Sequence, residues 1–293
     1  MLSFTLAIRP PYDWPSLRAY LAARATPGVE AIGDDGRYWR TMAIDGRAGV
    51  VAIGGAGNAL RVEASDALAD VARTLAARLR RTLDTDVDGA AVNAALACDP
   101  TLAPLVARRP GLRVPGAPSG FELALRAVLG QQVSVAGATT LAGRLAARVG
   151  EPIAVREPGA PASLGRLAVT AERLVDAGVD AVAAIGLPRK RAECLAGLAR
   201  AAADGELPEL TAHAPLADLD AWVARFTALS GIGPWTAQYV AMRALRCADA
   251  FPDGDLALRR AMGGLPARAL RAASAPWRPW RAYAAVHLWA SLA

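Results

Sequence analysis

A short glycine-rich turn precedes an apolar segment near residue 230, and its residue types suit contact with a phosphate. Gly231 and Gly233 lack a Cβ, so the backbone can adopt φ > 0 and approach a ligand closely. Pro234 is favoured at the first position of a helix, where its missing N–H would be unpaired anyway. The free N–H groups of such a helix start carry partial positive charge and can hold a phosphate. The pattern indicates a helix-hairpin-helix contact with a DNA backbone; a plain glycine turn between core helices is the alternative.

Aromatic residues follow this turn at helical spacing. Trp235, Tyr239 and Met242 stand at i, i+4 and i+7, so they share one face of the expected helix 234–245. Such a stripe most often belongs to a core. However, Trp235 falls in the first turn, beside the expected phosphate contact, and five of the seven tryptophans follow residue 220. The position favours an aromatic surface near a ligand, with core packing as the alternative.

A single carboxylate stands in a basic segment after this helix. Asp255 follows a Pro-Asp-Gly turn and precedes the helix expected over 256–262. Aspartate is favoured as a helix N-cap, and the helix dipole favours negative charge there. The same anion can stabilise a developing sugar cation or help to activate water. Asp253 is a second candidate for the functional carboxylate, but its place in the Pro-Asp-Gly turn is explained by turn formation alone. After Asp255 the segment to residue 293 contains six arginines and no other acid.

The composition favours an anionic partner. The chain has 293 residues, enough for two domains, and a formal net charge of +6 at pH 7. Lys190 is the only lysine, and arginine binds phosphate well through its planar fork. Excess positive charge favours nucleic acid, although a biased genome composition would also enrich arginine. Cys98, Cys194 and Cys247 are widely spaced. They show no metal-binding pattern, so we expect reduced thiols, no metal and no cofactor.

The sequence gives no sign of a membrane partner. No apolar run approaches the ~20 residues that span a bilayer. The first residues lack the basic region and the cleavage site of a signal peptide. We therefore expect a cytoplasmic chain, and we expect it to act as a monomer.

The hydrophobic periodicity changes at about residue 88. Before it we expect strands at 2–8, 37–44, 49–53 and 59–64 and helices at 15–24 and 66–83. After it we expect helices at 90–96, 101–108, 119–129, 135–149, 170–177, 179–185, 189–203, 216–229, 234–245, 256–262, 266–273 and 279–292. Ser119 and Glu122 form the pattern of a capping box. The predicted fold class is α+β, with a small N-terminal α/β domain, 1–88, and a mostly helical body, 89–293, around a cleft.

Together these segments resemble the helix-hairpin-helix DNA glycosylases, and most closely the branch that removes 3-methyladenine. The resemblance covers nearly the whole chain. It is carried by Pro10–Trp14, Leu21–Arg24, Arg109–Arg113, Leu129–Val135, Gly186–Glu193, Gly231–Ala237 and Trp277–Tyr283. It implies a TATA-binding-protein-like fold for residues 1–88. It also implies two helical lobes, one of residues 117–230 and one of residues 89–116 plus 231–293.

The resemblance also implies roles for individual residues. Asp255 lies at the position of the catalytic aspartate, with Trp235 beside it. Trp289, Tyr239 and Tyr20 match family positions that contact the base. The family positions that contact DNA match Gln132, Gly231, Gly233 and Thr236. The carbonyls near Thr227, Leu229 and Ile232 match a site for a monovalent cation between hairpin and phosphate.

The implied activity is hydrolysis of the N-glycosidic bond of alkylated bases, such as 3-methyladenine and 7-methylguanine, in duplex DNA. Alkylation makes the purine cationic and a better leaving group, and aromatic rings attract it by ~0.5–2 kcal/mol. Bifunctional relatives carry a lysine where this chain has Trp235, so the resemblance implies base release by water without strand cleavage. Two positions depart from the best-known member of the family. Gln132 stands where that member has an apolar wedge, and Gly254 stands where it has a second aspartate.

Two alternatives stay open at this point. One is a non-catalytic helix-hairpin-helix protein that binds damaged DNA, in which Asp255 is only a cap and the aromatic residues are core. The other is a glycosylase for a different lesion, such as uracil or an oxidised purine. Exposure of Trp235, Trp289 and Asp255 in one cleft favours the enzyme, whereas burial of all three favours the binding protein.

Overall fold

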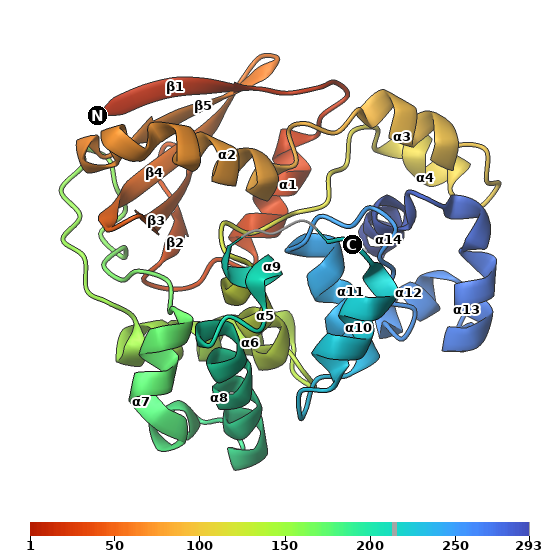
Figure 1. Ribbon diagram of the computed structural model, residues 1–293. Coiled ribbons are helices and arrows are strands. Elements are labelled where there is room, and N and C mark those ends of the chain that lie inside the picture. Colours follow the sequence, from red (N-terminus) through yellow and green to blue (C-terminus); the bar gives the residue numbers. More distant parts are fainter. Residues whose placement is uncertain (213–215, 293) are drawn as a thin grey trace.

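An antiparallel sheet forms the N-terminal part of the protein in a computed structural model that describes residues 1–212 and 216–292 (Figure 1). The strands are β1 (Leu2–Ala7), β2 (Glu30–Ile32), β3 (Tyr38–Ile44), β4 (Arg47–Ala56) and β5 (Ala59–Ala64), in the order β1-β5-β4-β3-β2. Phe4 pairs with Val62, and Tyr38 pairs with Ile53. This register places apolar side chains of neighbouring strands on the same face.

Both faces of this sheet are covered. Helix α1 (Trp14–Ala22), the 3₁₀ helix η1 (Asp66–Val71) and helix α2 (Ala72–Leu83) pack on one face, where Leu17 and Leu79 join the buried strand residues. On the other face Trp39 is buried with Leu164, which belongs to the loop that Figure 1 shows beside the sheet. Because α1 is fixed on the sheet, its C-terminal turn can present side chains to the helical body.

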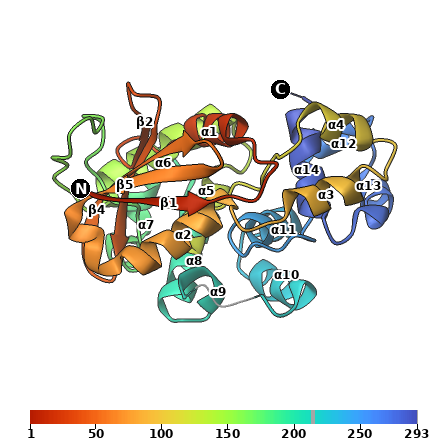
Figure 2. The same cartoon turned by 90° about the horizontal axis from the view of Figure 1, so that it is seen from above.

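The rest of the described chain is helical. The elements are α3 (Gly89–Leu96), α4 (Ala103–Arg108), α5 (Gly120–Leu129), α6 (Val135–Val149), α7 (Ala171–Ala183), α8 (Arg189–Ala203), α9 (Pro208–Thr211), α10 (Leu219–Thr227), α11 (Pro234–Arg243), α12 (Leu256–Ala261), α13 (Ala267–Ala273), η2 (Ala275–Trp277) and α14 (Arg281–Ala290). Figures 1 and 2 agree that α3 and α4 lie beside α13 and α14, away from α6, α7 and α8. None of the described helices is long and apolar enough to cross a bilayer.

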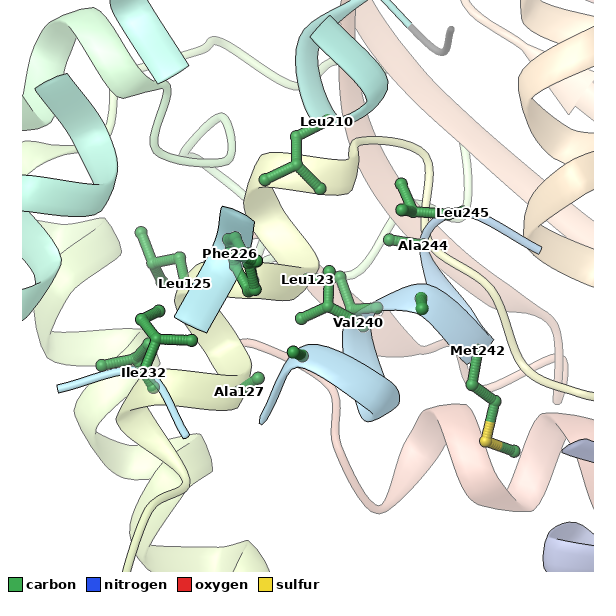
Figure 3. Close-up of a cluster of buried hydrophobic side chains, with 14 of the residues drawn as sticks. Leu123, Leu125, Ala127, Leu210, Phe226, Ile232, Val240, Met242, Ala244 and Leu245 are labelled. Carbon is green, nitrogen blue, oxygen red and sulfur yellow. The ribbon is translucent and has the colours of Figure 1, made fainter. Parts of the chain in front are cut away.

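A buried cluster joins the hairpin α10–α11 to α5 (Figure 3). Leu123 and Leu125 of α5 pack in the same core as Phe226 of α10 and Val240 of α11. Burial of each such side chain contributes about 1.5–3 kcal/mol. Met242 is also part of this core and only 1 % exposed. Ile232 and Ala237 belong to the same core, so the cluster fixes the start of α11 and with it the residues at its first turn.

The α+β fold class is confirmed, and the differences from the predicted elements are local. Residues 66–71 form a 3₁₀ helix before α2, and the short elements β2 and α9 were not predicted. Gly178, at φ +74°, separates the two helices predicted within 170–185. Ser119 Oγ accepts from the Glu122 amide at 3.4 Å, but the Glu122 carboxylate pairs with Arg40 instead of closing the capping box. The local sequence around Glu122 does not reveal Arg40 as its partner, because Arg40 lies 82 residues earlier in the chain.

Acid should destabilise the fold through one buried histidine. His287 of α14 is 2 % exposed, and burial lowers its pKa from the ordinary 6.5 to about 4. Between these values the unfolded chain binds a proton that the folded chain does not, so stability falls as the pH falls. We expect a loss of about 2 kcal/mol between pH 6.5 and pH 5. Urea unfolding of the protein and of His287→Gln at both pH values measures it, and an equal loss in both proteins would contradict this assignment.

Candidate active site

Asp255 lies at the N-cap of α12 and accepts hydrogen bonds from N–H groups alone. Its Oδ1 accepts from the amides of Ala257 and Leu258, both at 2.9 Å, and from the indole Nε1–H of Trp289 at 3.0 Å. Its Oδ2 accepts from Trp235 Nε1–H at 2.9 Å. A carboxylate has only acceptors, so these four donors match its charged form. Two helix amides and two indoles thus fix one half-buried anion.

Three aromatic rings surround this carboxylate. Trp235 stacks on Tyr239, one helical turn later, with ring centroids 5.2 Å apart and an interplanar angle of 15°. Tyr239 and Trp289 lie 6.2 Å apart at 59°. All three line a cleft of about 1030 Å³ together with Asp255. The predicted stripe therefore divides, because Trp235 and Tyr239 face the cleft while Met242 enters the core.

Tyr20 brings the sheet domain into the same cleft. Its hydroxyl lies 3.3 Å from the Tyr239 hydroxyl, although the residues are 219 positions apart. Burial raises the pKa of Tyr20 to about 12, against the opposing effect of Arg243. Burial also acts to raise the pKa of Tyr239, but Arg243 and the Tyr20 hydrogen bond outweigh it and lower that pKa. Arg243 donates to the Tyr239 hydroxyl and so fixes the pair.

The tyrosine rings are already occupied by arginines. The Arg24 guanidinium lies 3.7 Å from the centre of the Tyr20 ring, and that of Arg243 lies 5.0 Å from it. Arg243 is also 5.2 Å from the Tyr239 ring. The expected attraction of a cationic base by aromatic rings therefore falls mainly to Trp235 and Trp289.

The predicted phosphate-binding turn joins α10 to α11. Gly231 has φ +84°, and a Cβ there would lie 2.9 Å from Cys194 Sγ, so both conformation and space require glycine. Gly233 is the N-cap of α11 and Pro234 its first residue. The Leu229 carbonyl accepts from the Ile232 amide at 3.1 Å and retains a second lone pair. The donor set of the expected cation site is chemically suitable, and the cation stays a prediction.

Gln132 lies in an exposed turn opposite this hairpin. Its φ is +58°, a left-handed conformation that costs a non-glycine residue about 1–2 kcal/mol. Ser134 ends the turn as the N-cap of α6 and accepts from the Gly137 amide at 3.1 Å. Val133 and Val135 are exposed beside Gln132. The turn thus exposes the polar side chain of Gln132 between two apolar side chains. The contact of Gln132 with DNA stays a prediction.

Gln131 connects this turn to the hairpin and was not predicted. Its Nε2 donates to the Gly231 carbonyl at 3.1 Å and to Thr236 Oγ1 at 3.2 Å. Thr236 is buried, so it supports the hairpin through this bond. The sequence placed Gln131 only in a break between helices. Arg243 was also missed, although its position four residues after Tyr239 on one helix could have indicated it.

Loss of the Gln131 hydrogen bonds should uncouple the turn from the hairpin. For the base excision that the resemblance implies, we expect Gln131→Ala to lower the rate on duplex DNA about tenfold, as loss of one or two hydrogen bonds allows. Excision from single-stranded DNA, which has no opposite strand and so no duplex gap for the turn to fill, should stay within twofold. Parallel single-turnover assays on both substrates measure this. An equal fall on both substrates would mean that Gln131 merely supports the fold.

The comparisons with known proteins agree with this architecture. Residues 3–119 match the model of the AlkA N-terminal domain, and residues 125–267 match that of the HhH-GPD superfamily base excision DNA repair proteins. The fold and the cleft thus define a helix-hairpin-helix protein of the base excision repair class. The 3-methyladenine DNA glycosylase from Archaeoglobus fulgidus has the same fold, with a TM-score of 0.82 at 22% identity over 98% of this chain and 97% of that one.

Relatives define the family more closely. The chain is 37% identical over 288 residues to DNA-3-methyladenine glycosylase 2 of Escherichia coli, covering 98% of this chain and 96% of that protein. It is 40% identical over 296 residues to the probable bifunctional transcriptional activator/DNA repair enzyme AlkA of Mycobacterium tuberculosis. That alignment covers 99% of this chain but only 57% of the relative's length. The chain belongs to the AlkA family of DNA-3-methyladenine glycosylases.

Proposed function

We propose that this protein hydrolyses the N-glycosidic bond of alkylated bases, such as 3-methyladenine and 7-methylguanine, in duplex DNA. One observation carries the proposal: the Asp255 carboxylate is held by the indoles of Trp235 and Trp289 in one open cleft. All three side chains are partly exposed. This arrangement supports an enzyme over a protein that only binds DNA. The names and domains of the relatives support the same reaction.

Each part of the site has a role in this mechanism. The target nucleotide leaves the stack, and its base enters the cleft beside Trp235, Tyr239 and Trp289. The bond from the base to the sugar breaks with positive charge developing on the sugar, and the Asp255 carboxylate stabilises that charge. Water supplies the oxygen that replaces the base. The amides of the hairpin at Gly231 and Gly233 hold a backbone phosphate, and Gln132 occupies the gap left in the duplex.

We further propose that the enzyme acts alone, as a cytoplasmic monomer without lyase activity. A lyase needs an amine that attacks the sugar. The only lysine, Lys190, lies in the first turn of α8 and does not line the described cleft. We expect borohydride to trap no covalent DNA adduct, either with the protein or with Trp235→Lys, because the cleft is not built around an amine. A trapped adduct on denaturing gels, with a bifunctional glycosylase as positive control, would contradict this.

The reaction itself is tested by release of bases from methylated genomic DNA. We expect 3-methyladenine and 7-methylguanine to appear in the soluble fraction, identified by mass spectrometry, with abasic sites left in intact strands. Tight binding of methylated DNA without any released base would favour the binding protein. Release of uracil or oxidised purines alone would favour a glycosylase for a different lesion.

A further inference from the structure

The cleft that holds Asp255 has more space than one extrahelical base needs. Its volume of about 1030 Å³ reaches the upper end of the ~300–1,000 Å³ typical of pockets for whole drug-sized ligands. Beyond Tyr239 it extends to residues of the sheet domain, among them Tyr20 and Arg40. A purine held beside Asp255 therefore leaves room at the inner end of the cleft, where a substituent of the base can lie.

Besides Arg40, which pairs with Glu30 and Glu122, three arginines line this inner end, and we call these three the inner arginines. Arg24 and Arg243 contact the Tyr20 ring, and Arg126 donates to the Arg24 carbonyl at 3.0 Å. Within the described ranges, no Asp or Glu oxygen lies within 4.0 Å of their guanidinium nitrogens. The inner end therefore has an excess of positive charge.

The acids that line the cleft are engaged elsewhere. Glu122 accepts two hydrogen bonds from Arg40, at 3.0 and 3.2 Å, and Glu30 lies 3.4 Å from the same guanidinium. Asp255 is held by the two indoles at the outer end. None of these three carboxylates neutralises the inner arginines directly.

Neutral groups satisfy part of the N–H capacity of the inner arginines. Arg126 donates to the hydroxyls of Thr26 and Thr139, both at 3.3 Å, and Arg243 donates to the Pro115 carbonyl at 2.6 Å. Burial lowers the pKa of Arg126, and the more distant carboxylates offset this only in part. Buried charges in proteins are normally paired with an opposite charge. A ligand that brings an anion to the inner end would supply the missing partner.

We propose that the inner arginines bind a carboxylate carried by the substituent of an alkylated purine, so that carboxyalkyl purines are substrates of this cleft. The inference rests on the proposed glycosylase activity and defines a substrate class for it. The carboxylate is held and does not react. Water oxygen bonds to the sugar carbon, the bond from that carbon to the purine nitrogen breaks, its electron pair leaves with the base, and the water releases a proton.

A pair of matched adducts tests the inference. Genomic DNA is alkylated either with a carboxymethylating reagent or with a carbamoylmethylating reagent, which gives a neutral adduct of nearly the same size. Mass spectrometry measures the initial rate of release of each purine adduct. We expect the carboxymethyl purine to be released about tenfold faster than the carbamoyl purine, because a hydrogen bond to a charged group is stronger than one to a neutral group.

Two variants separate the inner arginines from general effects. Arg24→Gln should reduce the tenfold preference, measured as the ratio of the two adduct rates in this variant, to less than threefold. Arg18→Gln, a nearby arginine that does not line the cleft, should keep the preference. Equal rates for both adducts in the unmodified protein, or an unchanged preference in Arg24→Gln, would overturn the inference. Absence of any methylated base in the same assays would instead overturn the proposed function.

Discussion

Asp255→Asn should lower the rate of 3-methyladenine release about a hundredfold to a thousandfold, the usual loss when one electrostatic contact to a transition state is removed. The substitution keeps size and shape, so the amide oxygen can still cap α12 through Ala257 and Leu258. It removes the negative charge, and because the oxygen that caps α12 also accepts from Trp289, it places the NH₂ group against the Trp235 indole donor. Single-turnover release assays on methylated duplex DNA measure the effect.

Two controls show that this loss is chemical. The variant should unfold within about 1 kcal/mol of the parent protein, since the N-cap acceptor is kept. It should also bind an abasic-site duplex with an affinity within a few fold of the parent, because the hairpin and the Gln132 turn are unchanged. Near-normal release by Asp255→Asn would show that Asp255 is only a helix cap.

Arg40→Met should destabilise the fold by about 3–5 kcal/mol, because it leaves carboxylates buried without their cation. Arg40 of β3 is 3 % exposed and joins Glu30 to Glu122 of α5, so it connects the sheet to the helical body. Burial already raises the pKa of Glu122, and Arg40 opposes that shift. Without Arg40 the folded protein binds a proton at Glu122 more tightly than the unfolded chain does. The variant should therefore regain stability as the pH falls from 8 to 5.

The double variant Arg40→Met with Glu122→Leu is the matched control. It removes charge from both partners, and we expect it to recover more than half of the lost stability. Urea unfolding of the two single variants and the double variant at pH 8 completes the cycle. Strict additivity of the two single effects would contradict a direct ion pair.

The sequence predicted those parts of the structure that depend on local pattern. The hairpin with Gly231 and Gly233 was found because a turn with φ > 0 and a helix start have recognisable residue types. Helix 189–203 was predicted with the bounds that the structure has. The neighbourhood of Trp235, Trp289 and Asp255 came from the resemblance to a family, since 34 residues separate Asp255 from Trp289 in sequence.

What the sequence did not predict depends on contacts between distant segments. The carboxylate of Glu122 turns from its helix cap to Arg40, which lies 82 residues earlier. Tyr20 and Tyr239 were assigned to base contact by the resemblance alone, since α1 and α11 converge on one cleft only in the folded chain. Gln131 was hidden because a glutamine in a turn gives no periodic signal. Each of these residues acts through a partner that the local pattern does not specify.

The affinity for charged and neutral sugar analogues tests most directly whether Asp255 stabilises a sugar cation. One duplex carries a pyrrolidine ring, which is positively charged like the developing sugar, and the other carries a neutral tetrahydrofuran ring at the same position. We predict that the protein binds the pyrrolidine duplex at least tenfold more tightly, and that Asp255→Asn loses this preference while it binds the tetrahydrofuran duplex normally. Equal affinity of the protein for both duplexes, or the same preference in Asp255→Asn, would contradict the mechanism.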